Sequence, residues 1–102
     1  MNPISVYVKN GGALASFYDS DEILLLVRAD GKWSVSECLS LPAFDLSNQR
    51  ELRAQLYALA AALSDKGCKT IAGAGMNGIC FGILDRAGFA IFTIEALGDE
   101  ML

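Results

Sequence analysis

One glycine-rich segment combines residue types and spacing that could bind a ligand. Gly73-Ala74-Gly75-Met76-Asn77-Gly78 has the GxGxxG spacing and lies between a predicted strand and a predicted helix. Backbone amides and the helix dipole favour an anion at such a helix start. Glu95 follows Gly75 by twenty residues, where a dinucleotide fold has the acid that binds the ribose. The candidate ligand-binding residues here are Gly73, Gly75, Met76, Asn77 and Gly78.

The position of this segment in the chain argues against a dinucleotide site. A dinucleotide fold places this unit first and completes the site with further strand-helix-strand units. Here the unit is the last one, and the chain ends seven residues after Glu95. Two interpretations stay open: a tight turn that needs glycines for positive φ, or a site for another small anion, which would make the protein a small-molecule sensor.

Three cysteines, Cys38, Cys68 and Cys80, are the candidate ligands for a soft metal. Cys80 lies in the first turn of the predicted second helix, where the dipole can lower the pKa of a thiol. Cys68 begins the preceding predicted strand. If an iron–sulfur ligand exists, we expect Cys80 beside Met76 first and Cys68 second. The alternative is that these are structural thiols, and three dispersed cysteines without histidine do not form a zinc site.

The composition speaks against several classes of function. The chain has no histidine, which removes Ser-His and Cys-His nucleophile pairs, so we expect no enzyme. The net charge is −4 and the eight Lys and Arg residues are scattered, whereas a nucleic-acid binder normally has a basic face. We therefore expect no nucleic-acid partner.

Hydropathy and cysteine content favour the cytoplasm. No segment reaches the roughly 18 apolar residues that span a bilayer, so no membrane association is expected. The N-terminus opens into a strand pattern without the basic and apolar regions of a signal peptide. An odd number of cysteines without CxxC spacing is typical of reduced thiols in a cytosolic protein.

The 102 residues fit a single domain, with an ordered core over about residues 4–96 and a frayed tail at Gly98–Leu102. Alternation of apolar and polar residues predicts a first strand at Ile4–Val8. A second strand is expected at Glu22–Arg28, buried on both faces, and after an Asp30-Gly31 turn a third at Lys32–Leu39. The segment Ala13–Tyr18 is expected to be a short extended piece.

The second half of the sequence predicts two helical crossovers between strands. Ser47 is the expected N-cap of a helix over Asn48–Ser64, because its hydroxyl can accept a first-turn amide hydrogen. A strand at Cys68–Ala72, a helix at Ile79–Ala87 and a strand at Phe89–Glu95 complete the order β-β-β-α-β-α-β. This predicts an α/β protein (α+β, mixed sheet) with five strands in the order 3-2-1-4-5 and both helices on one face.

Strand patterns predict that the other face of the sheet is largely open. Ser5, Tyr7 and Lys9 share one side of the first strand, and Ser34 and Ser36 share one side of the third. This alternation is typical of a sheet that is covered on one face only. The open face is a candidate surface for a homodimer or another partner.

The chain resembles the AnfO family of iron-only nitrogenase accessory proteins over about residues 4–96. The resemblance rests on a set of short stretches in matching order and spacing: Ile4-Ser5-Val6-Tyr7-Val8, Ala15-Ser16-Phe17-Tyr18, Gly31-Lys32-Trp33, Glu51-Leu52-Arg53, Gly67-Cys68-Lys69 and Ala87-Gly88-Phe89. It implies a ribonuclease-H-like fold similar to the nitrogenase cofactor-carrier domains of the NifX and NafY type.

The resemblance also implies a role. The protein would bind or chaperone an iron–sulfur nitrogenase cofactor or its precursor, or bind a nitrogenase component or assembly protein. Carrier domains of this type often use a histidine near the cluster, and this sequence has none, so a ligand would have to be Cys80 or Cys68. The alternative is a docking or dimerisation module without a cofactor.

Overall fold

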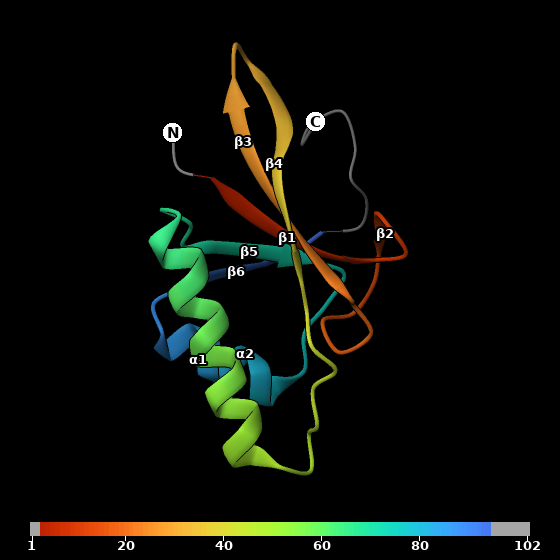
Figure 1. Ribbon diagram of the computed structural model, residues 1–102, viewed down its shortest axis with the longest axis vertical. Coiled ribbons are helices and arrows are strands. Elements are labelled where there is room, and N and C mark those ends of the chain that lie inside the picture. The colour runs from red at the N-terminus through yellow and green to blue at the C-terminus, as the bar shows by residue number, and fades with distance from the viewer. Residues whose placement is uncertain (1–2, 95–102) are drawn as a thin grey trace.

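The structure is a computed structural model that describes residues 3–94, with two helices packed against a twisted sheet (Figure 1). Glu95, expected to mimic a ribose-binding acid, and the tail Gly98–Leu102, expected to be frayed, lie outside the described residues. The elements are β1 (Ile4–Lys9), β2 (Ala13–Leu14), β3 (Glu22–Ala29), β4 (Lys32–Ser40), α1 (Gln49–Asp65), β5 (Thr70–Gly73), α2 (Gly78–Arg86) and β6 (Ala90–Thr93). Within residues 3–94, neither helix is both long enough and apolar enough to cross a bilayer.

The sheet mixes antiparallel and parallel pairs. Its order is β4-β3-β1-β5-β6, and β2 pairs with β1 beside this path. β3 pairs antiparallel with β1 and with β4, whereas β5 lies parallel to β1 and to β6. The α/β class with a mixed sheet and two helices is therefore confirmed. The sheet has six strands and not five, because Ala13 and Leu14 pair with Lys9 and Val8.

The main core lies between the sheet and the two helices. The sequence places leucines three or four residues apart along α1, so that one side of the helix is apolar. Leu52, Leu56 and Leu63 are fully buried on this side, and α2 contributes Ile83 and Leu84 to the same cluster. Both helices therefore cover the same face of the sheet.

The opposite face is not open at its centre, which corrects the expectation from the strand patterns. Ser5 and Tyr7 point to the helix side, where Ser5 Oγ donates to the carbonyl of Thr70 (2.8 Å). Val6 and Val8 point the other way and are 0% exposed in a second, smaller apolar cluster. Side chains remain exposed toward the two ends of this face, in β4 and β6.

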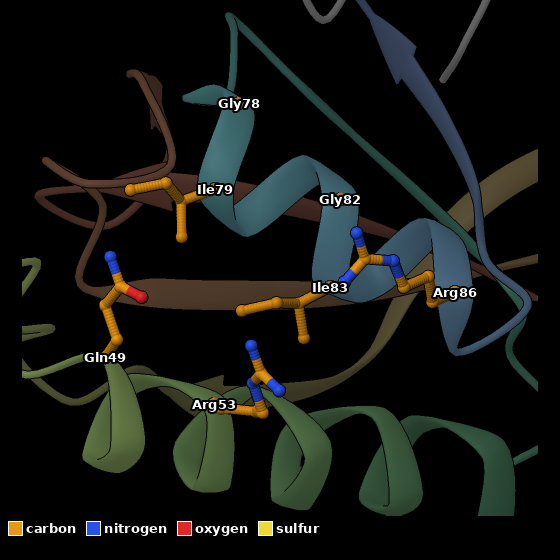
Figure 2. Close-up of a pocket in the computed structure, with 7 residues that line it drawn as sticks. All are labelled: Gln49, Arg53, Gly78, Ile79, Gly82, Ile83 and Arg86. Carbon is orange, nitrogen blue, oxygen red and sulfur yellow. The ribbon is translucent and has the colours of Figure 1, made fainter.

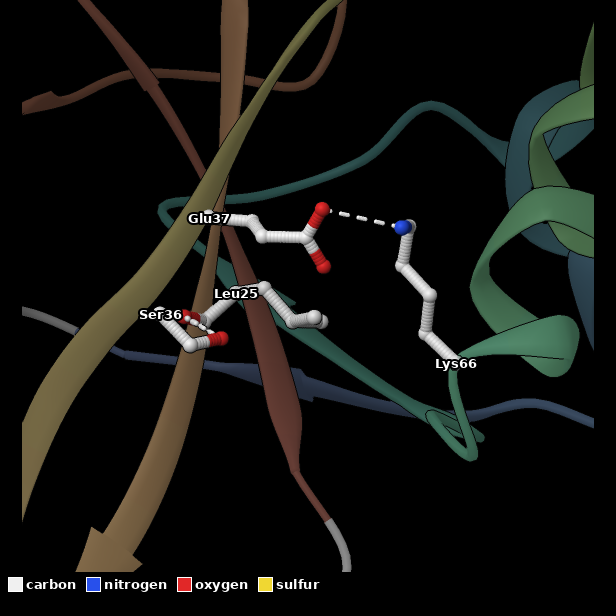
Figure 3. Close-up of polar contacts among 4 residues, drawn as sticks. All are labelled: Leu25, Ser36, Glu37 and Lys66. Atoms are coloured by element: carbon white, nitrogen blue, oxygen red, sulfur yellow. Dashed lines mark hydrogen bonds and ion pairs between the residues drawn. The ribbon is translucent and has the colours of Figure 1, made fainter.

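A bulge in β4 corrects the predicted alternation of that strand. Leu25 pairs with Glu37 but Leu26 pairs with Val35, so Ser36 is the extra residue. Ser36 Oγ donates to the carbonyl of Leu25 (3.3 Å, Figure 3). The extra residue reverses which side chains of β4 face each side of the sheet. Glu37 therefore points toward the helices.

Glu37 forms an ion pair with Lys66 at the end of α1. The Lys66 Nζ to Glu37 Oε1 distance is 2.9 Å, and the two side chains are 32% and 45% exposed (Figure 3). An ion pair this open to solvent contributes at most about 1 kcal/mol. It orients the end of α1 relative to β4, but the apolar core holds the helix in place.

The N-cap of α1 is Asn48 and not the predicted Ser47. Asn48 Oδ1 accepts from the Glu51 amide, and Asn48 Nδ2 donates to Glu51 Oε2, each at 3.2 Å. Ser47 instead donates to Asp45 through its hydroxyl (2.6 Å) and its amide (2.9 Å). These two hydrogen bonds lower the pKa of the Asp45 carboxyl. Ser47 and Asn48 both have side chains that can cap a helix. The prediction was wrong because Ser47 donates its hydrogen bonds to Asp45 instead.

The cap assignment predicts different effects for two adjacent substitutions. Asn48→Ala should lower the free energy of unfolding by about 1 kcal/mol, because it leaves a first-turn amide without its acceptor. Ser47→Ala should change it by less than about 0.5 kcal/mol, as expected for an exposed side chain. Urea unfolding followed by circular dichroism measures both values, and a larger loss for Ser47→Ala would contradict the assignment.

Candidate functional site

The glycine-rich segment begins at a close contact with Tyr7. Tyr7 is 1% exposed, and a Cβ built on Gly73 would overlap with Tyr7 Cε2. Real Cβ atoms do not approach ring carbons this closely, so the Tyr7 ring fills the space of a side chain at position 73. Gly73 is therefore required for packing, whatever else this segment does.

Gly75 is tied to the rest of the molecule through both of its backbone polar groups. Its amide donates to the Tyr7 hydroxyl (3.2 Å), and its carbonyl accepts from the Phe17 amide (2.8 Å). Burial raises the pKa of Tyr7, and the Gly75 hydrogen bond partly offsets this. Gly75 has a φ of +153°, which glycine adopts without strain. Its amide is thus already engaged by a protein oxygen in this arrangement.

Asn77 occupies the position where an anion at the start of α2 would bind. Its Oδ1 accepts from the Cys80 amide (2.9 Å), and its Nδ2 donates to Cys80 Sγ (3.4 Å). Cys80 is 1% exposed, and burial raises the pKa of its thiol. Desolvation of the thiolate outweighs the Asn77 hydrogen bond, which lowers the pKa, so the shift is opposite in direction to the one expected at a helix start. Met76 is half-buried and packs against the helix-side core.

Cys68 lies just before β5 and not within it, which shifts the predicted strand start by two residues. It is 0% exposed, and its thiol donates to the carbonyl of Thr70 (3.3 Å). Cys38 is exposed on β4. Among residues 3–94, no group of three or more His, Cys, Asp or Glu side chains is arranged to hold a metal ion.

These contacts indicate whether the candidate residues could act as ligands of an iron–sulfur cluster. A cluster needs accessible thiolates, whereas Cys80 and Cys68 are enclosed thiols with hydrogen-bond partners of their own. The residues do not fit a cluster in this arrangement. A cofactor site formed by the glycine-rich segment, Cys80 and Cys68 therefore stays a prediction.

A groove between α1 and α2 gathers polar side chains that the sequence did not single out. Gln49 and Arg53 border it from α1, and Gly78, Gly82 and Arg86 border it from α2 (Figure 2). These residues are four apart within each helix, so they form one stripe on each. That spacing was visible in the sequence, but nothing in the sequence showed that the two stripes face each other.

A second hollow lies on the other side of α1, against the end of β4. It is open to solvent, has a volume of about 470 Å³ and is mostly apolar, with Leu39 and Pro42 on one side and Leu59 and Ala62 on the other. Gln55 Oε1 is buried at this hollow and has no hydrogen-bond partner among residues 3–94. An orphaned acceptor beside an exposed apolar surface is a feature that a binding partner can satisfy.

Comparison with known proteins identifies a family and a related fold. The family model described as "Iron only nitrogenase protein AnfO" matches residues 3–102. No curated protein matches the chain. Among solved structures, the one titled "Crystal structure of PH0822" is similar with a TM-score of 0.61 at 12% sequence identity, over 89% of this chain and 77% of that one. At this identity the likeness concerns the fold alone.

The Tyr7 contact predicts opposite outcomes at two glycines. Gly73→Ala should lower the free energy of unfolding by roughly 1–3 kcal/mol, because the ring must move to admit a methyl group. Gly82→Ala should raise it by about 0.5–1 kcal/mol, because a Cβ there meets nothing within 4 Å and alanine favours the helix. Urea titration compares the two, and a neutral Gly73→Ala would contradict the packing role.

Burial predicts how the three thiols react with a colorimetric thiol reagent at pH 8. Cys38 should react at once, and Cys68 and Cys80 roughly 10-fold slower or more, because they need local opening. Cys38→Ser should remove the fast phase and leave the slow phase unchanged. Fast labelling of Cys80 in the native protein, identified by peptide mass, would show that its thiol is accessible.

Proposed function

Because the chain belongs to the AnfO family of iron-only nitrogenase proteins, we propose that it is a non-enzymatic accessory protein of nitrogenase assembly or maturation in the cytoplasm. The single observation that carries this proposal is the family match, which extends over residues 3–102. We propose further that the protein acts by binding a nitrogenase component, because its candidate cofactor ligands are enclosed.

The apolar hollow beside α1 is the surface that best suits a protein partner. Ala58 and Ala62 of α1 are exposed at its border, so the helix offers small side chains that a partner can approach closely. A partner that covers the hollow would bury apolar area, which is the main source of affinity in protein association. A donor from the partner would also satisfy Gln55 Oε1.

Chaperoning of an iron–sulfur nitrogenase cofactor or its precursor is the alternative role. Such a cluster would be cargo of this protein. Its candidate contacts are Gly73–Gly78 and Cys80, with Cys68 as a second thiol, and the first turn of α2 would have to open before Cys80 could bind it. The enclosed thiols make this the second choice.

Self-association is a further candidate, through the face of the sheet that carries no helix. Val35 of β4 is 50% exposed and Phe92 of β6 is 56% exposed. Their strand partners Leu26 and Ala72 belong to the smaller apolar cluster, which places both exposed side chains on this face. Sedimentation of the protein at rising concentration decides whether it forms a homodimer.

The strand arrangement also supports a ribonuclease-H-like topology, which we infer for this chain. The support is the antiparallel unit β1-β3-β4 extended by the parallel strands β5 and β6. Nuclease activity does not follow, since it needs several acidic residues that converge on metal ions. The strand β1, Ile4–Lys9, contains no acidic residue.

Two alanines in α1 test the docking proposal against purified components of an iron-only nitrogenase. Ala62→Glu introduces a charge at the apolar hollow and should weaken co-elution on gel filtration by about 10-fold or more, because a buried, unpaired carboxylate is costly. Ala61→Glu makes the same change at an exposed neighbour outside the hollow, and binding should persist.

Other outcomes of these binding experiments would contradict the docking role or the proposed interface. Equal binding by both variants would remove the hollow as the interface. Absence of binding by the unmodified protein to every component would overturn the docking role. Anaerobic co-elution with an isolated iron–sulfur cofactor that is lost on Cys80→Ser would replace the docking role with cofactor chaperoning.

A further inference from the structure

Two arginines, Arg53 and Arg86, line the groove between α1 and α2. Arg53 comes from the second turn of α1 and Arg86 from the last turn of α2. Figure 2 shows Arg53 reaching from α1 toward α2, and Arg86 running back along α2 toward Gly82. Neither guanidinium forms an ion pair within residues 3–94, where the ion pair present is Lys66–Glu37. Two cations that share a hollow repel each other unless an anion lies between them.

The remaining lining of the groove also suits an anion. None of its lining residues is acidic. Gln49 lies one turn before Arg53 on α1 and adds a side-chain amide at the end of the groove next to Ile79 (Figure 2). Gly78 and Ile79 border this same end, and their amides belong to the first turn of α2 and have no acceptor within that helix. The groove therefore offers hydrogen-bond donors along its length.

The size of the groove limits the ligand. Its volume of about 160 Å³ corresponds to roughly five water molecules at about 30 Å³ each. Gly82 leaves the floor open, since a Cβ there would meet nothing within 4 Å. Ile79, which is 43% exposed, adds an apolar border. A charged group of a few heavy atoms fits this space.

We propose that this groove binds a small oxyanion, a carboxylate or phosphate group on a short organic molecule, with Arg53 and Arg86 as the principal ligands. Planar guanidinium groups bind such oxyanions through paired hydrogen bonds. This site shares only Gly78 with the glycine-rich segment, in which Tyr7 and Asn77 engage the Gly75 and Cys80 amides. It does not depend on the nitrogenase role.

Nuclear magnetic resonance titration of the full chain tests this proposal with two probes, inorganic phosphate and succinate, at constant ionic strength set with chloride. We expect saturable shifts of the arginine Nε–Hε signals of Arg53 and Arg86 and of the Gly78 and Ile79 amides. Shifts that grow linearly without saturation for both probes would overturn the site.

Matched variants separate the groove from general charge effects. Arg53→Gln and Arg86→Gln should each weaken binding by roughly 10-fold or more, as expected for loss of a hydrogen bond to a charged group. Arg50→Gln removes a charge from the same helix outside the groove and should leave the affinity within about twofold. An equal loss from Arg50→Gln would show nonspecific attraction and overturn the assignment.

Gly82→Leu tests the groove without any change of charge. A leucine there should fill the floor and abolish saturable binding, whereas leucine is a good helix former and the fold should persist. Backbone amide spectra establish folding for every variant. Retained binding by Gly82→Leu would place the anion elsewhere.

Discussion

The packing of the Tyr7 ring against the backbone of Gly73 is the constraint on which the arrangement around β5 depends. β1 and β5 pair in parallel with Ser5 beside Ile71 and Val6 beside Ala72, so position 73 lies next to Tyr7. The ring then extends to the Gly75 amide and contacts Phe17 edge to face, with centroids 5.2 Å apart. One side chain thus fixes the end of a central strand and the path of the chain toward α2.

Phe17 links the packing around Tyr7 to the segment that precedes α1. Its ring stacks on Phe44 at 5.1 Å, in the segment that leads from β4 to α1. The chain from β2 to β3 and the chain from β4 to α1 are therefore held by the same aromatic group. The glycine spacing that resembles a nucleotide-binding signature follows from this packing. Gly73 must leave room for the Tyr7 ring, and Gly75 must adopt a positive φ.

Local patterns predicted the elements of this fold and missed the features that depend on contacts between them. The Asp30-Gly31 turn was predictable because both residues tolerate positive φ, which they adopt at 53° and 78°. The bulge at Ser36 was not, because one extra residue in a strand leaves no mark on its composition. The raised pKa of Cys80 was missed because burial depends on the whole core. The arginine groove was missed because its two sides lie 33 residues apart, at positions 53 and 86.

The bulge in β4 has a consequence for how the protein behaves when crowded. β4 and β6 are the outer strands of the described sheet, and an exposed outer strand can recruit strands from other chains into aggregates. In β4 the extra residue interrupts the row of backbone donors and acceptors, and β6 has only four residues. Neither outer strand offers a long, regular template, so growth of the sheet by addition of further molecules is disfavoured at both ends.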